Sequence, residues 1–213
     1  MYVNGVCFIN TISFHIKSTA AENVANIEAI NLQNSIKQVK CIYMQSGFKV
    51  VNILIDVQFG WIHGQLSNLH IHLNICSKND HVKEIEWLKR KIKERDREIY
   101  NTISLQNLLG RMIVEFTALV VFCLNVLPPS PSISGEPSRR KIITGMIVEY
   151  TKNYSLQFSE YAQVHKSNDN MMQDHMMGAI DLCPTGKTIG AYYFMILTTG
   201  ICLNHQQFNT LPL

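Results

Sequence analysis

The sequence predicts an α/β core over residues 1–127 and a small β-rich domain over residues 141–213. The apolar run at residues 48–56 lacks polar alternation, which is typical of a parallel strand covered on both faces, and a second strand of this kind is predicted at residues 70–76. Four prolines and four serines fall within residues 128–140, so this segment is predicted to be a linker between the two domains.

The N-terminal region is predicted to run from strand to helix. Residues 6–16 are rich in β-branched and aromatic side chains, which favours one strand or a short hairpin. Apolar residues then recur at helical spacing over residues 19–45, and Gly47 provides a stop for the helix. The apolar positions of this predicted helix are Val24, Ile27, Leu32, Ile36, Val39 and Ile42.

Two helices are predicted after the second apolar run. The first covers residues 80–104, where Asp80 is a suitable N-cap and one stripe of the helix is apolar. The second covers residues 105–127 and ends at Pro128. Its apolar part, residues 112–127, contains Glu115 and is shorter than the roughly 20 residues of a membrane span, so we expect a buried helix.

The C-terminal region is predicted to be a small antiparallel barrel or sheet. After a short helical stretch at KIITG, the strand-like segments EYAQVH, MGAIDLC, AYYFMIL and ICL are separated by turn sequences. The TGKT at residues 185–188 lacks the leading glycine of a phosphate-binding loop and precedes a strand-like segment, so we expect no nucleotide site there.

Composition indicates a globular chain and excludes little else. The chain has 213 residues, 46% of them apolar and 16% charged, and a net charge of +3 that is too small to identify a nucleic-acid-binding protein. Its six cysteines form no C-x-x-C pair, which favours reduced thiols and an intracellular protein. Its histidines show no zinc-ligand spacing, so we interpret them as structural or surface residues.

One aspartate lies where open α/β sheets place ligands. Asp56 ends the strand NILID, at the carboxyl end of a predicted parallel strand, although aspartate also begins turns well. Glu86, near the start of the following charged helix, is a candidate partner, because magnesium takes carboxylate oxygens from separate elements. In the alternative interpretation, Glu84 and Glu86 favour the positive end of the helix and pair with lysines.

Five stretches of the chain carry a family resemblance: SIKQVKCIYMQSGFKVVNILIDVQF, HVKEIEWLKRKIKERDREIYNTI, GRMIVEFTALVVFCLNVLPP, RKIITGMIVEYTK and GAIDLCPTGKTIGAYYFMILTTGICLN. With them, nearly the whole chain resembles the integrase region of copia-type retrotransposon polyproteins. The resemblance implies an RNase H-like core with three catalytic carboxylates, of which Asp56 and Glu86 are the second and third. It also implies that the ancestral reaction was Mg²⁺-assisted strand transfer of element DNA into target DNA.

Three departures from the family pattern imply that this activity is lost. None of the six aspartates precedes Asp56, so the first catalytic aspartate, expected just ahead of MYVNGVCF, is absent. Val57 replaces the family's glycine after the second aspartate, and the histidine–cysteine zinc module is absent. Loss of a ligand removes the ion geometry that phosphoryl transfer requires, so we expect no bound Mg²⁺ and a degenerate, inactive core.

Basic residues predict weak DNA binding at most. Lys89, Arg90 and Lys93 lie on the charged helix, but acidic residues interleave with them and a solvated helix face remains the alternative. Arg139 and Arg140 are the last two residues of the linker and could contact phosphate. Two other functions stay open: a magnesium-dependent integrase fragment completed by upstream sequence or another chain, and a small intracellular interaction module. We expect no membrane partner, and we expect self-association if a sheet edge is exposed.

Overall fold

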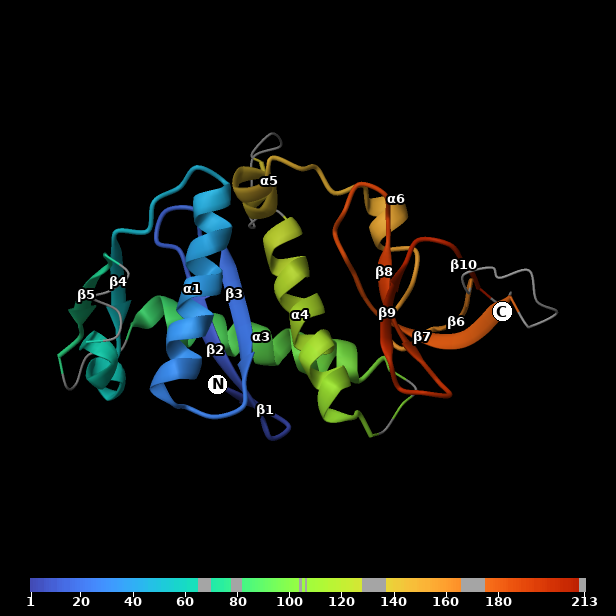
Figure 1. Ribbon diagram of the computed structural model, residues 1–213, viewed down its shortest axis with the longest axis horizontal. Coiled ribbons are helices and arrows are strands. Elements are labelled where there is room, and N and C mark those ends of the chain that lie inside the picture. Colours follow the sequence, from blue (N-terminus) through green and yellow to red (C-terminus); the bar gives the residue numbers. More distant parts are fainter. Residues whose placement is uncertain are drawn as a thin grey trace. The chain divides into compact units, whose positions relative to one another are not determined.

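The computed structural model describes residues 1–64, 70–77, 82–103, 105, 107–127, 137–165 and 175–210 (Figure 1). It combines helices with strands, as the sequence predicts, and divides into two compact units. Unit 1 comprises Met1–Arg95 and Cys123–Gly145, and unit 2 comprises Asp96–Phe122 and Met146–Leu213. The predicted domain limits at residues 127 and 141 remain predictions.

Unit 1 begins with a three-stranded antiparallel sheet in the order β1-β2-β3. Asn4 and Gly5 connect β1 to β2, both with positive φ, as expected of a two-residue hairpin turn. Residues 13–18 connect β2 to β3. The strands are β1 (Tyr2–Val3), β2 (Val6–Ile12) and β3 (Thr19–Val24).

The prediction that the first helix begins at residue 19 is wrong. Residues 19–24 form β3, which pairs with β2 from Ile12↔Thr19 to Cys7↔Val24, because antiparallel pairing outweighs the helical spacing of two apolar residues. Helix α1 instead spans Ala29–Gln45. It ends as predicted at Gly47, whose φ of +79° allows its N–H to bond the Met44 carbonyl.

The second sheet of unit 1 is a parallel pair, β4 (Asn52–Ile55) with β5 (His72–Ile75), which Figure 1 shows side by side. One face packs through Ile55 and Leu73 towards α1 in a cluster that contains Leu32 and Ile62. The opposite face is exposed, with Leu54 at 49%. Coverage on both faces was therefore a wrong prediction, and the half-covered pair provides only a thin core.

Two long helices follow, as predicted, with shorter bounds. Helix α3 spans Lys83–Tyr100 and buries Leu88 and Ile92 completely, while Asp80, its predicted N-cap, lies outside the described residues. Helix α4 spans Gly110–Val126. Most of the predicted linker also lies outside the described residues. Its last residues are helical: α5 (Arg139–Thr144) begins at the N-cap Ser138, whose side chain accepts a hydrogen bond from the Lys141 N–H.

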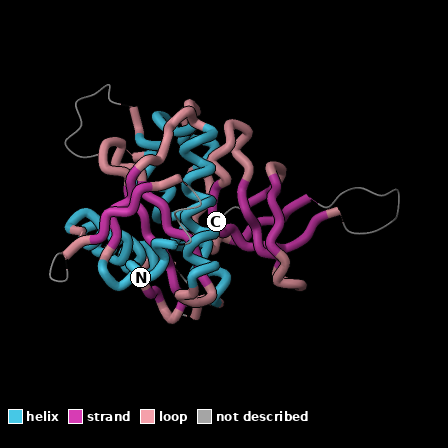
Figure 2. Tube along the Cα trace, turned by 60° about the vertical axis from the view of Figure 1, so that its left-hand side comes forward, coloured by secondary structure: helices cyan, strands magenta, loops and turns pink. Residues whose placement is uncertain are grey.

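Unit 2 contains an open antiparallel sheet in the order β10-β6-β7-β8-β9, the magenta strands grouped together in Figure 2. Its β-rich character was predicted, but the barrel was not confirmed, because no pairing joins β9 to β10 within the described residues. Helix α6 (Tyr150–Asn153) precedes the sheet. The strands are β6 (Tyr161–His165), β7 (Met176–Pro184), β8 (Tyr192–Ile196), β9 (Cys202–His205) and β10 (Phe208–Thr210).

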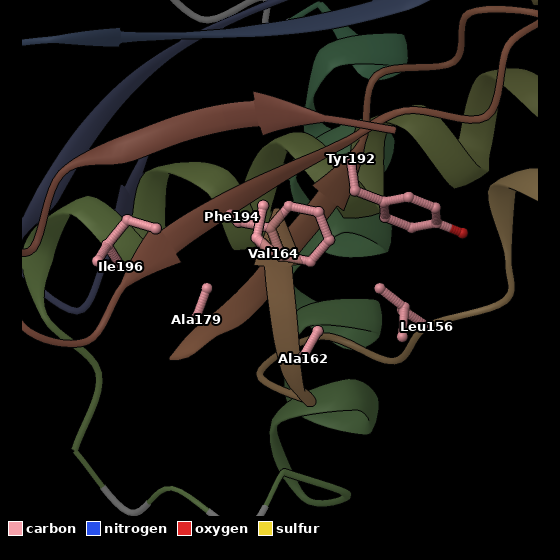
Figure 3. Close-up of a cluster of buried hydrophobic side chains, with 7 residues drawn as sticks. All are labelled: Leu156, Ala162, Val164, Ala179, Tyr192, Phe194 and Ile196. Atoms are coloured by element: carbon pink, nitrogen blue, oxygen red, sulfur yellow. The ribbon is translucent and has the colours of Figure 1, made fainter. Parts of the chain in front are cut away.

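Both faces of this sheet are covered by apolar side chains. On one face Tyr192 and Phe194 are fully buried, and Figure 3 shows them gathered with their neighbours. On the other face Met112 and Phe116 of α4 pack against β7 and β8. The first cluster comprises Leu156, Ala162, Val164, Ala179, Tyr192, Phe194 and Ile196.

All six cysteines are described, and each is a free thiol. Within the described residues, no helix is both long enough and apolar enough to span a bilayer.

Candidate functional site

Asp56 lies at the predicted place, directly after the last residue of β4. Its backbone is extended and opens a 3₁₀ helix, η1 (Val57–Ile62), in which the Asp56 carbonyl accepts a hydrogen bond from the Phe59 N–H at 3.0 Å. The residue is half-buried, and Val57 beside it is 45% exposed. Asp56 therefore both ends a parallel strand and begins a turn, so the two interpretations describe the same position.

Glu86 lies in the first turn of α3 and forms an ion pair. One carboxylate oxygen is 2.7 Å from Nζ of Lys89, three residues further along the helix. The Glu86 side chain is 51% exposed, so water competes for the same oxygens. This i,i+3 pairing is the arrangement expected from the alternative interpretation of Glu86.

Asp56 and Glu86 are the predicted magnesium ligands of the chain. Mg²⁺ prefers near-octahedral oxygen ligands at about 2.1 Å, usually several waters together with one or two carboxylates. No group of three or more His, Cys, Asp or Glu side chains within the described ranges could hold a metal ion. The assignment of Asp56 and Glu86 as metal ligands therefore stays a prediction from the family resemblance.

The exposed face of α3 carries most of the predicted basic residues. Arg90 and Lys93 are exposed, whereas Lys89 is paired with Glu86. Two further basic residues, Lys83 and Arg97, are exposed on the same helix. At 100° per residue, Lys83, Arg90, Lys93 and Arg97 lie within roughly 80° of one another around the helix axis. We call these four residues the α3 basic stripe.

Ion pairs neutralise the acidic residues closest to this stripe. Glu86 is bound by Lys89, and Glu94 is bound by Lys91 at 3.2 Å. Within the described part of the chain, none of the four stripe residues forms an ion pair. The interleaved acids, which in the sequence suggested a balanced face, thus leave a stripe of net positive charge about 21 Å long.

Arg139 and Arg140 have different surroundings from the stripe. Nη1 of Arg139 donates a hydrogen bond to the Leu124 carbonyl at 3.0 Å, near the C-terminal end of α4, where a positive charge is favourable. Burial lowers the pKa of this guanidinium from its usual value. Arg140 is half-buried at the start of α5. At least Arg139 serves to close a helix end, and its contact with phosphate stays a prediction.

Unit 2 holds two buried acids that sequence reasoning did not single out. Burial raises the pKa of Asp96 to about 7, and both its oxygens lack a hydrogen-bond partner among the described residues. Burial, with a smaller contribution from the neighbouring Glu160 carboxylate, raises the pKa of Asp181 to about 8. Both side chains are nearly inaccessible to water, which makes them sensitive to pH rather than suited to binding a cation.

Comparisons with known proteins concern the fold. No protein-family model and no curated protein matches the chain. The structure is similar to the catalytic core domain of BIV integrase, with a TM-score of 0.49, 13% identity and coverage of 68% of this chain and 90% of that one. It is also similar to the HTLV-2 integrase catalytic core domain in complex with magnesium, with a TM-score of 0.49, 13% identity and coverage of 67% of this chain and 89% of that one. A third similar structure is the simian T-cell lymphotropic virus intasome in complex with PP2A regulatory subunit B56 gamma, with a TM-score of 0.49, 9% identity and coverage of 93% of this chain and 73% of that one.

Two residues of the α3 basic stripe, Lys83 and Arg97, were not among the predicted nucleic-acid contacts. Lys83, Arg90 and Arg97 are spaced seven residues apart, which brings them to almost the same side of a helix at 3.6 residues per turn. This spacing was available in the sequence. The sequence does not show which lysines form ion pairs with Glu86 and Glu94, because each acid has several basic neighbours within reach.

Proposed function

We propose that the chain derives from the integrase region of a copia-type retrotransposon polyprotein and acts, inside the cell, as a sequence-independent nucleic-acid-binding remnant. In this proposal the chain no longer carries out the ancestral strand transfer. The observation that carries it is the α3 basic stripe, four exposed cations on one side of a helix. The family origin is supported by the sequence stretches quoted above.

The stripe has the dimensions of a phosphate-backbone contact. Lys83 and Arg97 are separated by 14 residues, or about 21 Å of helix, a length over which a DNA strand presents several phosphates. Such contacts position a protein on the duplex and carry no sequence information. Binding is therefore expected to be weak, electrostatic and independent of sequence.

The surroundings of Glu86 favour binding over catalysis. The ammonium 2.7 Å from the Glu86 carboxylate offsets part of its negative charge, which weakens its attraction for a metal ion. The cation that pairs with Glu86 also keeps its negative charge from repelling a nearby phosphate. The same ion pair thus disfavours Mg²⁺ binding and favours contact with a polyanion.

A charge-removal experiment tests the proposal. Fluorescence anisotropy of a labelled duplex of about 20 base pairs, at about 50 mM salt, should give a measurable Kd for the wild type. Arg90→Gln should weaken binding several-fold, because one phosphate contact is lost. Lys37→Gln, which removes an exposed lysine from α1, is the matched control and should leave Kd within a factor of two or so. Equal Kd values for wild type and Arg90→Gln would contradict the assignment.

A separate assay addresses strand transfer. The purified chain should not join a DNA end to target DNA in the presence of Mg²⁺. Joining that requires Mg²⁺ and disappears in Asp56→Asn would overturn the remnant proposal and support the alternative of a magnesium-dependent integrase fragment.

A further inference from the structure

The hairpin that connects β2 to β3 presents an aromatic ring to solvent. Its tip, residues 13–18, has the sequence SFHIKS, and Phe14 is 70% exposed, more than any other large hydrophobic side chain among the described residues. Exposure alone would not identify a site, because single apolar side chains are common on protein surfaces. The organisation around the ring is what requires an explanation.

Two neighbouring side chains hold the ring. Nζ of Lys17 lies over the Phe14 ring, 4.8 Å from its centroid. The His15 ring is 5.2 Å away and perpendicular to it, at 89°. A cation over one face of an aromatic ring is an attractive arrangement, and it leaves the ring largely open to solvent.

The backbone of the tip is held by its own hydrogen bonds. The Ser13 N–H donates to the Ser18 carbonyl at 2.9 Å, and the Ser18 N–H donates to the Ser13 hydroxyl at 3.0 Å. The Lys17 N–H donates to the Ser13 carbonyl at 3.0 Å, with Lys17 in the left-handed region at φ +57°. A non-glycine residue in this conformation is unusual, and here it brings the lysine back over the ring.

The charge of the tip restricts the kind of partner. Residues 13–18 include Lys17 and no acidic side chain. A flat apolar ring beside a cation matches a nucleotide, which has a flat base with a π face and a phosphate next to it. A base pair inside a duplex has no free face, whereas an unpaired base does.

We propose that the β2–β3 hairpin tip binds unpaired bases of a single-stranded nucleic acid, with Phe14 as the stacking surface and Lys17 as the phosphate contact. A base stacks on the open side of the Phe14 ring, and Lys17 remains next to it to meet the backbone. This inference rests on the proposed nucleic-acid function and adds to it a class of ligand that the α3 basic stripe does not distinguish.

Substitution at Phe14 separates stacking from charge. Binding of the full chain to labelled oligothymidylate of about 20 nucleotides should weaken about tenfold in Phe14→Leu, which keeps an apolar side chain and removes the π face. Phe14→Trp should bind at least as well as wild type, and its added fluorescence should be quenched by the oligonucleotide. Tyr150→Leu, a change at another half-exposed aromatic residue, is the matched control and should have no effect.

An abasic oligonucleotide of the same length makes the test specific. Wild type and Phe14→Leu should bind it equally, because only phosphates remain. Lys17→Gln should weaken binding to both oligonucleotides. Equal binding of oligothymidylate by wild type and Phe14→Leu, or an unquenched Phe14→Trp, would overturn the inference.

The two proposals fail separately. If Arg90→Gln weakens duplex binding while Phe14→Leu leaves oligothymidylate binding unchanged, only the hairpin inference fails. If Phe14→Leu weakens oligothymidylate binding while duplex binding is undetectable, the α3 basic stripe proposal fails and the hairpin inference stands.

Discussion

The candidate catalytic residue Asp56 lies beside one sheet, and the most closely packed core lies around another. The parallel pair β4–β5 in unit 1 precedes and follows the turn at Asp56, and its outer face is exposed, with Leu54 at 49%. The five-stranded sheet of unit 2 is covered on both faces, and Phe194 in it is 0% exposed. The candidate catalytic edge at Asp56 therefore lies in the more thinly packed of the two sheets.

The largest expected effect comes from equivalent truncations in the two sheets. Phe194→Ala should lower the free energy of unfolding by about 3–5 kcal/mol, because it leaves a cavity in a closed core. Leu54→Ala should cost less than about 1 kcal/mol, because half of that side chain already contacts water. Urea unfolding of both variants measures the difference. Equal costs would contradict the contrast between the sheets.

The next largest expected effect is a pH dependence of stability that comes from Asp181 in the sheet of unit 2. Asp181 has a pKa of about 8 in the folded state, above its ordinary 3.8, so the folded state holds a proton that the unfolded chain releases. The stability linked to this proton is complete below about pH 4 and is lost as pH rises towards about 8. Asp96, with a pKa of about 7, acts in the same direction.

Asp181→Asn should therefore reduce the loss of unfolding free energy that accompanies rising pH. From about pH 5 to about pH 8, the wild type should lose stability at up to about 1 kcal/mol per pH unit more than the variant. Urea unfolding at a series of pH values checks this slope, and Glu94→Gln, at a partly exposed ion pair, is the control. Parallel profiles for wild type and Asp181→Asn would show that Asp181 is ionised in the folded protein.

A smaller effect concerns the outer edge of β3. Asn125 of α4 holds the backbone of Thr19 on both sides: its side-chain oxygen accepts from the Thr19 N–H at 2.9 Å, and its nitrogen donates to the Thr19 carbonyl at 2.7 Å. Asn125→Ala should destabilise unit 1 by about 1–3 kcal/mol. Asn125→Asp should cost more, because a carboxylate oxygen then faces the carbonyl. Hydrogen exchange of the Thr19 amide, unchanged in Asn125→Ala, would exclude this role.

The smallest expected effect is at the candidate metal ligand itself. Glu86→Gln breaks an exposed i,i+3 ion pair and should change stability by less than about 0.5 kcal/mol. Millimolar Mg²⁺ should leave Tm unchanged in wild type and variant alike. A Tm increase with Mg²⁺ that both Glu86→Gln and Asp56→Asn abolish would restore the magnesium interpretation.

Individual helices and strands could be predicted from the sequence better than the pairing between distant strands. Gly47 ended α1 as expected because positive φ is a local requirement, and the apolar stripe of α3 placed Leu88 and Ile92 in the interior. Residues 19–24 were misassigned because Val24 fits both a helical spacing and a strand that pairs with β2. Pairing between distant residues decides such cases, and local periodicity does not contain it.

The candidate site could be predicted only in part. Asp56 at the end of a parallel strand follows from local pattern, whereas the role of Arg139 in closing α4 depends on Leu124, 15 residues away. Asp181 reads in the sequence as one polar residue in MGAIDLC, and only the sheet shows it to be buried. Burial and ion pairing depend on the assembled fold, which is why these roles emerged with the structure.

The salt dependence of duplex binding shows whether the α3 basic stripe contacts DNA phosphates. If all four residues of the α3 basic stripe contact phosphates, log Kobs should fall against log salt concentration with a slope of about −3 to −4 for the wild type. The variant with Gln at positions 83, 90, 93 and 97 should bind more weakly, with a slope close to zero. A wild-type slope that persists unchanged in this variant would contradict the assignment of nucleic-acid binding to α3.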